Sequence, residues 1–230
     1  MPLSSVLTVD IRAGERQRYL DLCQELSENA RNKKDPFQWT THETRIGKAN
    51  RIHFVLAAAD FAEIENNGTP DEMIGRVLGE KRALEWLDVS DACVESQQQD
   101  ISVDRPDLSY VPSERDTMAP AAIITVVQAR PGHQEGSEEL IRKIAEAIPK
   151  VDDGSQIITY QTVVGDLMRY WTVRPLESLA DLDKHLPAAQ LLNEAFGPAE
   201  GGLIFRSGLE AISAVERNVV VYRPELSNAG

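Results

Sequence analysis

Cysteine and aromatic residues are scarce in this chain, and several familiar catalytic motifs are missing from it. Only 2 of the 230 residues are cysteines, and aromatic residues make up 6% of the sequence. We find no P-loop, G-x-G-x-x-G, G-x-S-x-G, H-E-x-x-H or C-x-x-C motif. These absences argue against the nucleotide-binding, serine-nucleophile and zinc sites that such motifs build.

An excess of positive charge and long apolar runs are also lacking. The formal net charge is −13 at pH 7, whereas nucleic acids and anionic membranes attract basic faces. No apolar segment approaches the length that spans a bilayer, and Asp10 and Arg12 interrupt the first one too early for a signal peptide. We therefore expect an acidic, cytoplasmic protein with no nucleic-acid and no membrane partner.

What the chain does contain is an internal repeat. The stretch at 10–14, Asp-Ile-Arg-Ala-Gly, returns at 128–132 as Gln-Ala-Arg-Pro-Gly, so Gly132 lies 118 positions after Gly14. The same offset pairs Leu22 with Leu140, Thr41 with Thr159, Thr44 with Thr162, Gly47 with Gly165, Arg51 with Arg169, Val55 with Val173 and Gly79 with Gly197. This period is too long for a solenoid unit and predicts two copies of one small domain.

The repeat also sets the expected boundaries. We predict a first ferredoxin-like repeat over 1–112, a linker over 113–120 and a second repeat over 121–230. The stretch from Tyr110 to Pro120 is short, polar and flanked by prolines, which suits a surface tether. The cysteines follow the same logic: Cys23 and Cys93 align with Ile141 and Ala211, so we expect buried free thiols, not a disulfide or a metal site.

Each copy shows the same order of expected elements. In the first copy, the β-rich and helical patterns occupy residues 6–11 (strand), 15–33 (helix), 37–46 and 51–56 (a hairpin around Gly47-Lys48), 61–78 (helical) and 99–104 (strand). The stretch at 86–94 fits neither pattern clearly. The order β-α-β-β-α-β predicts an α+β, ferredoxin-like unit with an antiparallel sheet and helices on one face.

A ferredoxin-like sheet covers one face with its helices and leaves the other face in need of a partner. Two linked copies supply that partner to each other. The duplicated unit therefore resembles, over nearly the whole chain, the dimeric α+β barrel superfamily in a fused, tandem form. Within it, the antibiotic-biosynthesis-monooxygenase-like and NIPSNAP-like groups are the most similar. The resemblance implies two tandem ferredoxin-like repeats packed as an intramolecular barrel, a monomer or a homodimer, and no cofactor.

The sharpest repeated motif is Arg-Pro-Asp/Glu-Leu-Ser, at 105–109 and again at 223–227. Proline restricts the backbone and removes an N–H group at the end of the expected last strand. We interpret the motif as an arm that leaves this strand and helps to clasp the two halves, in preference to a catalytic role.

The two copies differ where chemistry is expected. A turn at Gly47-Lys48 places His42 opposite His53, and the same register places Tyr160 opposite Trp171 in the second copy. Residue alternation puts Ile52, Phe54 and Leu56 on the face that meets the helices. The opposite face then carries the polar candidates, which are Asp10, His42, Arg51, His53, Asp100 and Ser102.

These residues support an enzyme hypothesis. Histidines near a carboxylate transfer protons near neutral pH. The resemblance implies a cofactor-independent monooxygenase-like enzyme acting on an aromatic or polyketide-like molecule. Its small-molecule ligand would meet His53 or His42 as base, Arg51 as stabiliser of the anion, Asp10, and the walls Tyr160, Trp171 and Tyr222.

Other interpretations stay open. The histidines would equally serve as hydrogen-bonded residues in a filled, non-catalytic ligand-binding or structural barrel. Haem binding ranks third, since no histidine is well placed on a helix as an axial ligand. His42, His53 and Asp10 resemble a metal facial triad only weakly, so we predict no metal. We expect Trp39 in the core, His133 exposed, and His185 in a capping or surface role.

Overall fold

The computed structural model describes residues 2–112, 119–151 and 154–229. The chain divides into two compact units, which we call unit 1 (Met1–Ser102 with Val221–Gly230) and unit 2 (Val103–Val220). Unit 1 therefore includes the end of the second copy, and unit 2 includes the end of the first copy. The repeat boundaries drawn from the sequence at 112 and 121 stay a prediction, and the expected linker at 113–120 lies largely outside the described residues.

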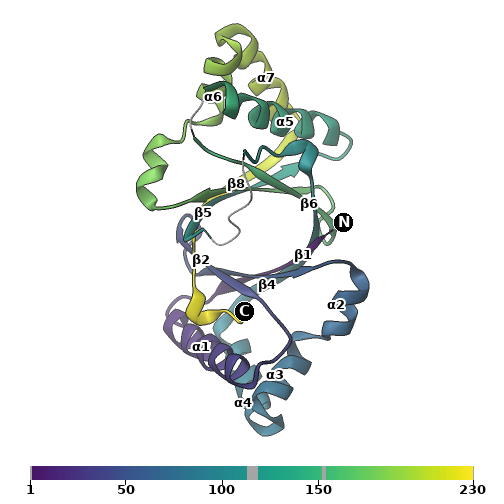
Figure 1. Cartoon of the computed structure of the whole chain (residues 1–230), viewed down its shortest axis with the longest axis vertical. Coiled ribbons are helices and arrows are strands. Elements are labelled where there is room, and N and C mark those ends of the chain that lie inside the picture. Colours follow the sequence, from purple (N-terminus) through teal and green to yellow (C-terminus); the bar gives the residue numbers. More distant parts are fainter. Residues whose placement is uncertain (1, 113–118, 152–153, 230) are drawn as a thin grey trace. The chain divides into compact units, whose positions relative to one another are not determined.

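The first copy contains four strands and the helices between them (Figure 1). Its elements are β1 (Leu3–Ile11), α1 (Arg16–Lys33), β2 (Thr40–Ile46), β3 (Arg51–Ala58), α2 (Phe61–Asn67), α3 (Pro70–Leu78), α4 (Glu80–Cys93), β4 (Val94–Asp104) and the 3-10 turn η1 (Pro106–Leu108). The stretch that the sequence left unassigned belongs to α4 and the start of β4. Trp86 lies on the buried side of α4, and its indole N–H donates to the carbonyl of Leu22 over 3.0 Å.

The second copy repeats this order. Its elements are β5 (Ala121–Ala129), α5 (Gln134–Val151), β6 (Ile158–Val164), β7 (Arg169–Leu176), η2 (Leu179–Lys184), α6 (Ala188–Phe196), α7 (Pro198–Glu210), β8 (Ile212–Tyr222) and η3 (Pro224–Leu226). The repeated glycines have a backbone reason, because Gly79 and Gly197 separate the paired helices at φ angles of 81° and 84°. That region favours glycine, which lacks a Cβ atom.

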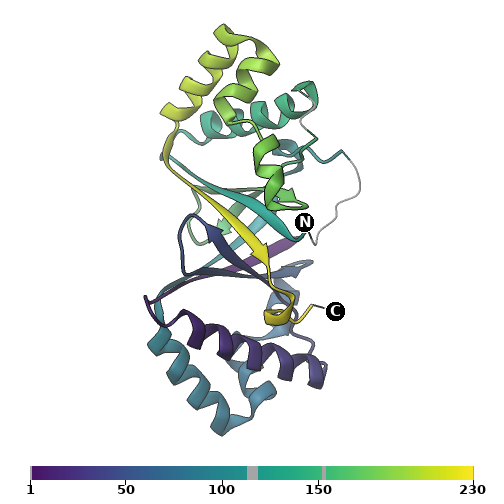
Figure 2. The same ribbon diagram turned by 90° about the vertical axis from the view of Figure 1, so that its left-hand side faces the viewer.

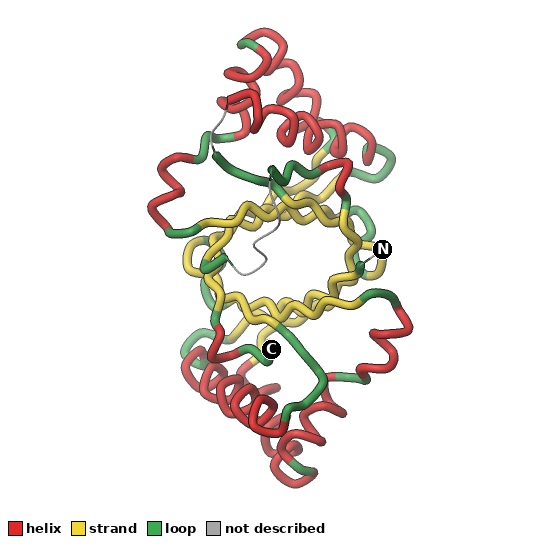
Figure 3. Tube along the Cα trace, viewed as in Figure 1, coloured by secondary structure: helices red, strands yellow, loops and turns green. Residues whose placement is uncertain are grey.

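The strands of each unit form an antiparallel sheet whose helices lie on one face (Figure 3). The order is β4-β1-β3-β2 in one copy and β8-β5-β7-β6 in the other. All eight strands together follow the order of a closed barrel, β1-β3-β2-β8-β5-β7-β6-β4. The expected α+β class, with two tandem ferredoxin-like repeats, is confirmed.

Each sheet packs one face against its own helices. In unit 1, Ile52 of β3 is 1% exposed and belongs to a core with Leu20 and Cys23 of α1. In unit 2, Tyr170 of β7 takes the same position and packs with Leu140 and Ile141 of α5. Strand residues alternate between faces, so the neighbours of Ile52 in β3, Arg51 and His53, point away from the helices. The free, buried state of Cys23 and Cys93 is confirmed.

The repeated Arg-Pro-Asp/Glu-Leu-Ser arms form η1 and η3, and each belongs to the unit of the other copy. Leu226 is 1% exposed in unit 1, and Ser27 of α1 donates from its hydroxyl to the carbonyl of Glu225 over 2.6 Å. Figure 2 shows η3, in yellow, beside α1. Leu108 is fully buried in unit 2, among residues of α5 and β7. The arms therefore have a packing role in the described structure.

Candidate functional site

The two histidines lie side by side on the helix-free face of unit 1. The β2–β3 register places His42 directly opposite His53, as the sequence predicted. Thr8 is the partner of His53 in the β1–β3 register, and its Oγ1 lies 3.0 Å from His53 Nδ1. On the other side, His42 Nε2 lies 3.2 Å from Thr40 Oγ1. Thr8 on β1 and Thr40 on β2 thus orient the imidazole pair.

Burial keeps both imidazoles neutral. His53 is 2% exposed, and loss of hydration lowers its pKa from 6.5 to about 3. The positive charge of Arg51 and the neighbouring His42 lower this pKa further, whereas the Asp10 carboxylate acts in the opposite direction. Burial likewise lowers the pKa of His42 to about 4. At neutral pH, each ring therefore carries one basic nitrogen able to accept a proton or a hydrogen bond.

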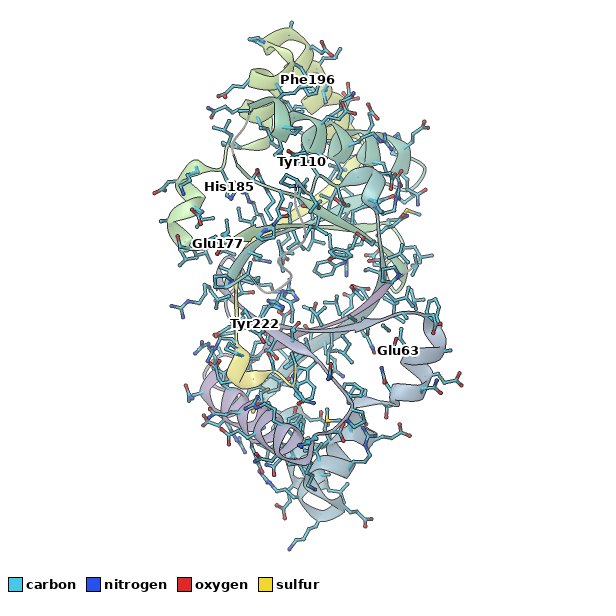
Figure 4. The ribbon with its side chains drawn as sticks, viewed as in Figure 1. Glu63, Tyr110, Glu177, His185, Phe196 and Tyr222 are labelled. Carbon is cyan, nitrogen blue, oxygen red and sulfur yellow. The ribbon has the colours of Figure 1, made fainter. Side chains whose placement is uncertain are left out.

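Tyr222, at the end of β8, completes this part of the site. Its ring centroid lies 5.7 Å from that of His42, with an angle of 43° between the ring planes. Figure 4 shows Tyr222 on the side of the unit 1 strands that faces away from α1. A tilted contact of this kind buries aromatic surface and leaves the phenol at one edge of the imidazole pair.

A charged cluster lies next to the histidines along β1 and β3. Arg51 donates from Nε and Nη2 to the two carboxylate oxygens of Asp10, at 2.7 and 3.0 Å. Lys48 Nζ and Ser96 Oγ donate to the same carboxylate at 2.8 and 3.0 Å. Burial alone would raise the pKa of Asp10, but these hydrogen bonds outweigh it and hold the pKa well below its usual range. Asp10 therefore stays ionised and fixes Arg51, which lies two residues before His53 on the same face of β3.

Unit 2 has aromatic residues where unit 1 has histidines. The β6–β7 register places Tyr160 opposite Trp171, as predicted. The Trp171 indole N–H donates to Thr162 Oγ1 over 3.3 Å. Arg169 lies 5.9 Å from the Trp171 ring and pairs with Asp166 at 3.1 Å. The predicted contact of Tyr160 and Trp171 with a ligand stays a prediction, since both belong to a different unit from the histidines.

The other sequence candidates have varied positions. Asp100 and Ser102 are each 1% exposed, and Asp100 accepts a hydrogen bond from Gln98 at 3.0 Å. Trp39 is in the core, as expected, and its indole N–H donates to the carbonyl of Leu226 over 2.9 Å. His133 is exposed, as expected. His185 is the half-buried residue that caps η2 (Figure 4).

Four residues that hold the site together could not be singled out from the sequence. They are Thr8, Thr40, Lys48 and Ser96. The position of Thr8 is predictable from strand pairing, because the first and third strands pair so that Thr8 lies opposite His53. Lys48 and Ser96 gave no such signal, since one lies in a turn and the other in a strand whose start was misplaced.

The described residues contain no group of three or more His, Cys, Asp and Glu side chains that could hold a metal ion. In the same part of the chain, no helix is long and apolar enough to cross a membrane. The candidate site is built from two neutral imidazoles, a tyrosine and an arginine that shares one carboxylate with a lysine, so this charged cluster keeps a net positive charge.

Solved structures resemble this chain along nearly its whole length. An anthrone oxidase-like protein matches with a TM-score of 0.64 and 12% identity, over 100% of this chain and 94% of its own. A candidate monooxygenase from Fusobacterium nucleatum subsp. nucleatum has a TM-score of 0.56 and 11% identity, over 96% and 92%. Chlorite dismutase from Candidatus Nitrospira defluvii has a TM-score of 0.53 and 10% identity, over 97% and 92%.

The chain therefore shares the α+β barrel fold of these proteins. No protein-family model matches the sequence, and no curated protein matches it either. Identities this low show a shared fold and leave the reaction open, because one fold hosts many chemistries.

Proposed function

We propose that unit 1 removes a proton from a small phenolic or enolisable molecule, and that the resulting anion reacts directly with O2. The observation that carries this proposal is the pair of neutral, facing imidazoles at His42 and His53. A buried neutral histidine accepts a proton readily only if a negative charge forms beside it. A substrate that becomes an anion on deprotonation provides that charge, so the proton transfer creates its own ion pair.

The reaction balances without a bound cofactor. For an aromatic ketone with an acidic methylene group, one methylene group and one molecule of O2 give one carbonyl group and one molecule of water. The base takes one proton from the methylene carbon, and the carbanion passes electrons to O2 to form a C–O bond. The base returns its proton to the peroxide and removes the second C–H proton. The O–O bond then breaks, and the leaving hydroxide takes that proton from the base to give water. O2 is the only oxidant that this sequence requires, and the protein supplies orientation and the base.

The two histidines differ in their exposure, and this difference suggests different roles. His42 is half-buried and next to Tyr222, whereas His53 is almost fully enclosed and hydrogen-bonded to Thr8. We assign His42 as the group that meets the substrate and His53 as the partner that supports the charge on it. Arg51, held by Asp10, stabilises the anion through its positive charge. Tyr222 contacts the substrate ring.

The fold likeness is consistent with this chemistry, because its matches include proteins named as a candidate monooxygenase and an anthrone oxidase-like protein. Those names describe the other proteins. They define the first compounds to test here, which are anthrones, phenols and quinols.

Oxygen uptake with such compounds tests the proposal. We expect His42→Gln to lower turnover by about 100-fold or more, the usual contribution of a positioned general base. His53→Gln should lower turnover less, because His53 acts on His42 and not on the substrate. His133→Gln is the matched control, since His133 is exposed and belongs to the second copy. Turnover that survives in His42→Gln at the level of the control would refute the assignment of His42 as base.

A second function, ligand binding without catalysis, is favoured by one observation. His53 is 2% exposed and hydrogen-bonded to Thr8, as expected of a structural histidine. A thermal-shift screen with the same compounds separates the two functions, because a ligand that binds the folded state raises the melting temperature by mass action. Binding without oxygen uptake would favour the non-catalytic function.

A further inference from the structure

The C-terminal arm, residues 223–228, runs along the helix side of β2, directly behind the histidine site. Arg223 follows Tyr222 in the chain, and its guanidinium forms an ion pair with Glu43, which follows His42. The backbone N–H of Arg223 also donates to the carbonyl of Thr41 over 2.9 Å. The two adjacent pairs therefore face opposite ways: the ion pair lies on the helix side, and the His42–Tyr222 ring contact lies on the other side.

The same arm holds the residue before His42. The backbone N–H of Thr41 donates to Ser227 Oγ over 2.9 Å, and Thr41 Oγ1 donates to the carbonyl of Leu226 over 2.7 Å. Thr41 is fully buried, and the Glu43 side chain is 4% exposed. Glu43 pairs in addition with Arg16 of α1. Both residues that flank His42 are thus fixed by buried hydrogen bonds or ion pairs, which leave little freedom to its backbone.

We propose that Arg223 is a positioning residue for His42, and that the C-terminal end of the second copy is a working part of the histidine site in unit 1. The Arg223–Glu43 ion pair, together with the hydrogen bonds of the arm to Thr41, holds the two strand ends that carry Tyr222 and His42 in register. Without the ion pair, the end of β8 shifts relative to β2, water reaches the imidazole, and the ring contact is lost. The inference rests on the site proposed above, but its test needs no substrate.

Unit 2 offers matched controls for the contacts of the arm. Arg105 there donates to Gln161, the counterpart of Glu43, and pairs with Glu138 of α5 at 2.9 Å. The backbone N–H of Thr159 donates to Ser109 Oγ over 2.9 Å, as Thr41 does to Ser227. These contacts bracket Tyr160, where unit 1 has His42. Loss of the Arg105 contacts therefore disturbs an equivalent set of arm contacts that lies beside no histidine pair.

The experiment is a proton NMR titration of the histidine rings in the full chain. The sequence has 4 histidines, so each Hε1 signal can be assigned by a single His→Gln variant. Near His42 are Thr40 on its own strand, His53 on β3 and Tyr222 on β8, with the Arg51–Asp10 pair further along β3 and β1. In Arg223→Ala, we expect the His42 midpoint to rise by about one pH unit as water enters, and the His42–Tyr222 ring NOE to disappear.

Arg105→Ala should leave the His42 midpoint and the NOE unchanged, even where it lowers the melting temperature as much as Arg223→Ala does. Arg223→Lys keeps the charge next to Glu43 and should restore most of the NOE. If Arg223→Ala does not fold, Ser227→Ala and its counterpart Ser109→Ala are compared in the same way. Equal effects of the two arms on His42, or none from either, would overturn the inference. Absence of oxygen uptake in the wild type would refute the proposed reaction and leave this result intact.

Discussion

The two copies differ in the residues that face each other across their hairpins, β2–β3 in the first copy and β6–β7 in the second. His42 and His53 occupy the register positions that Tyr160 and Trp171 occupy in the second copy. The surrounding scaffold is shared, since Thr41 and Thr159 are both fully buried and hold the arm of their unit. Two side-chain differences on a common frame are therefore enough to give unit 1 a titratable pair and unit 2 an aromatic one.

The lowered pKa values of the histidines predict a loss of stability in mild acid. An unfolded histidine binds a proton below pH 6.5, whereas folded His53 stays neutral down to about pH 3. The unfolded state then binds more protons, so the free energy of unfolding falls as the pH drops from 6.5 towards that value. The loss between pH 7 and pH 5 is about 2 kcal/mol for such a group. His42, with a pKa of about 4, acts in the same direction.

Urea unfolding of the wild type and His53→Gln at pH 7 and pH 5 checks this prediction. The wild type should lose more stability than the variant over this interval, because glutamine does not titrate. His133→Gln should behave as the wild type, since His133 is exposed. A pH dependence that is identical in His53→Gln and the wild type would show that His53 is protonated in the folded state or titrates normally.

The faces of the strands could be predicted from the sequence, but the partners of the charged residues could not. Alternation of Ile52 and His53 fixes the face of each, because one side must meet the helices. The hydrogen bonds that Asp10 accepts from Arg51, Lys48 and Ser96 come from three separate elements. No local pattern specifies that these three elements meet at one carboxylate, so the partners of Asp10 could not be predicted from the sequence. The contact of Asp10 with a ligand stays a prediction.

At the scale of elements, the paired helices of the second copy, α6 and α7, depend on close backbone approach. In unit 2, α7 crosses α6 at Gly201, where an added Cβ atom would lie 2.4 Å from the carbonyl oxygen of Leu192. Such a distance requires the two helices to move apart. The next residue, Gly202, has more room, because only the ends of the Arg206 and Asn193 side chains lie nearby, at 3.4 and 3.8 Å.

The two glycines therefore predict opposite effects of the same substitution. Gly201→Ala should lower the free energy of unfolding by about 1–3 kcal/mol, the cost of overpacking a close contact. Gly202→Ala should raise it by about 0.5–1 kcal/mol, because alanine restricts the unfolded chain and favours the helix. Denaturant unfolding of both variants measures the difference. Equal stability of the two variants would contradict the close α6–α7 approach.

Element prediction from the sequence failed where apolar spacing was interrupted. The buried face of α4 includes Ser90 beside Trp86 and Cys93, so its apolar stripe is incomplete and resembles neither a helix nor a strand. Similarly, β4 begins at Val94 with a run of polar residues, and the sequence placed its start only at Gln99. Local periodicity is weak in both places, and tertiary packing decides the structure.

At the scale of the whole molecule, the chain exchanges the ends of its two copies. The repeat is tandem in sequence, yet unit 1 includes residues 221–230 and unit 2 includes the arm that follows β4. The sequence predicted a clasp from the repeated Arg-Pro-Asp/Glu-Leu-Ser motif. It could not show that Arg223 would pair with Glu43, the residue that follows His42, because the two lie 180 positions apart. Exchange of ends gives the second copy a part in the site of the first.

The central claim is that unit 1 converts a bound acid into its anion, and ultraviolet–visible difference spectroscopy under argon tests it most directly. Without O2 the reaction stops at the anion, whose absorption differs from that of the neutral compound. We predict that the wild type, titrated with 1,8-dihydroxyanthrone at pH 7, shows the anion spectrum, and that His42→Gln binds the same compound in its neutral form. A neutral spectrum for the ligand bound to the wild type would contradict the account.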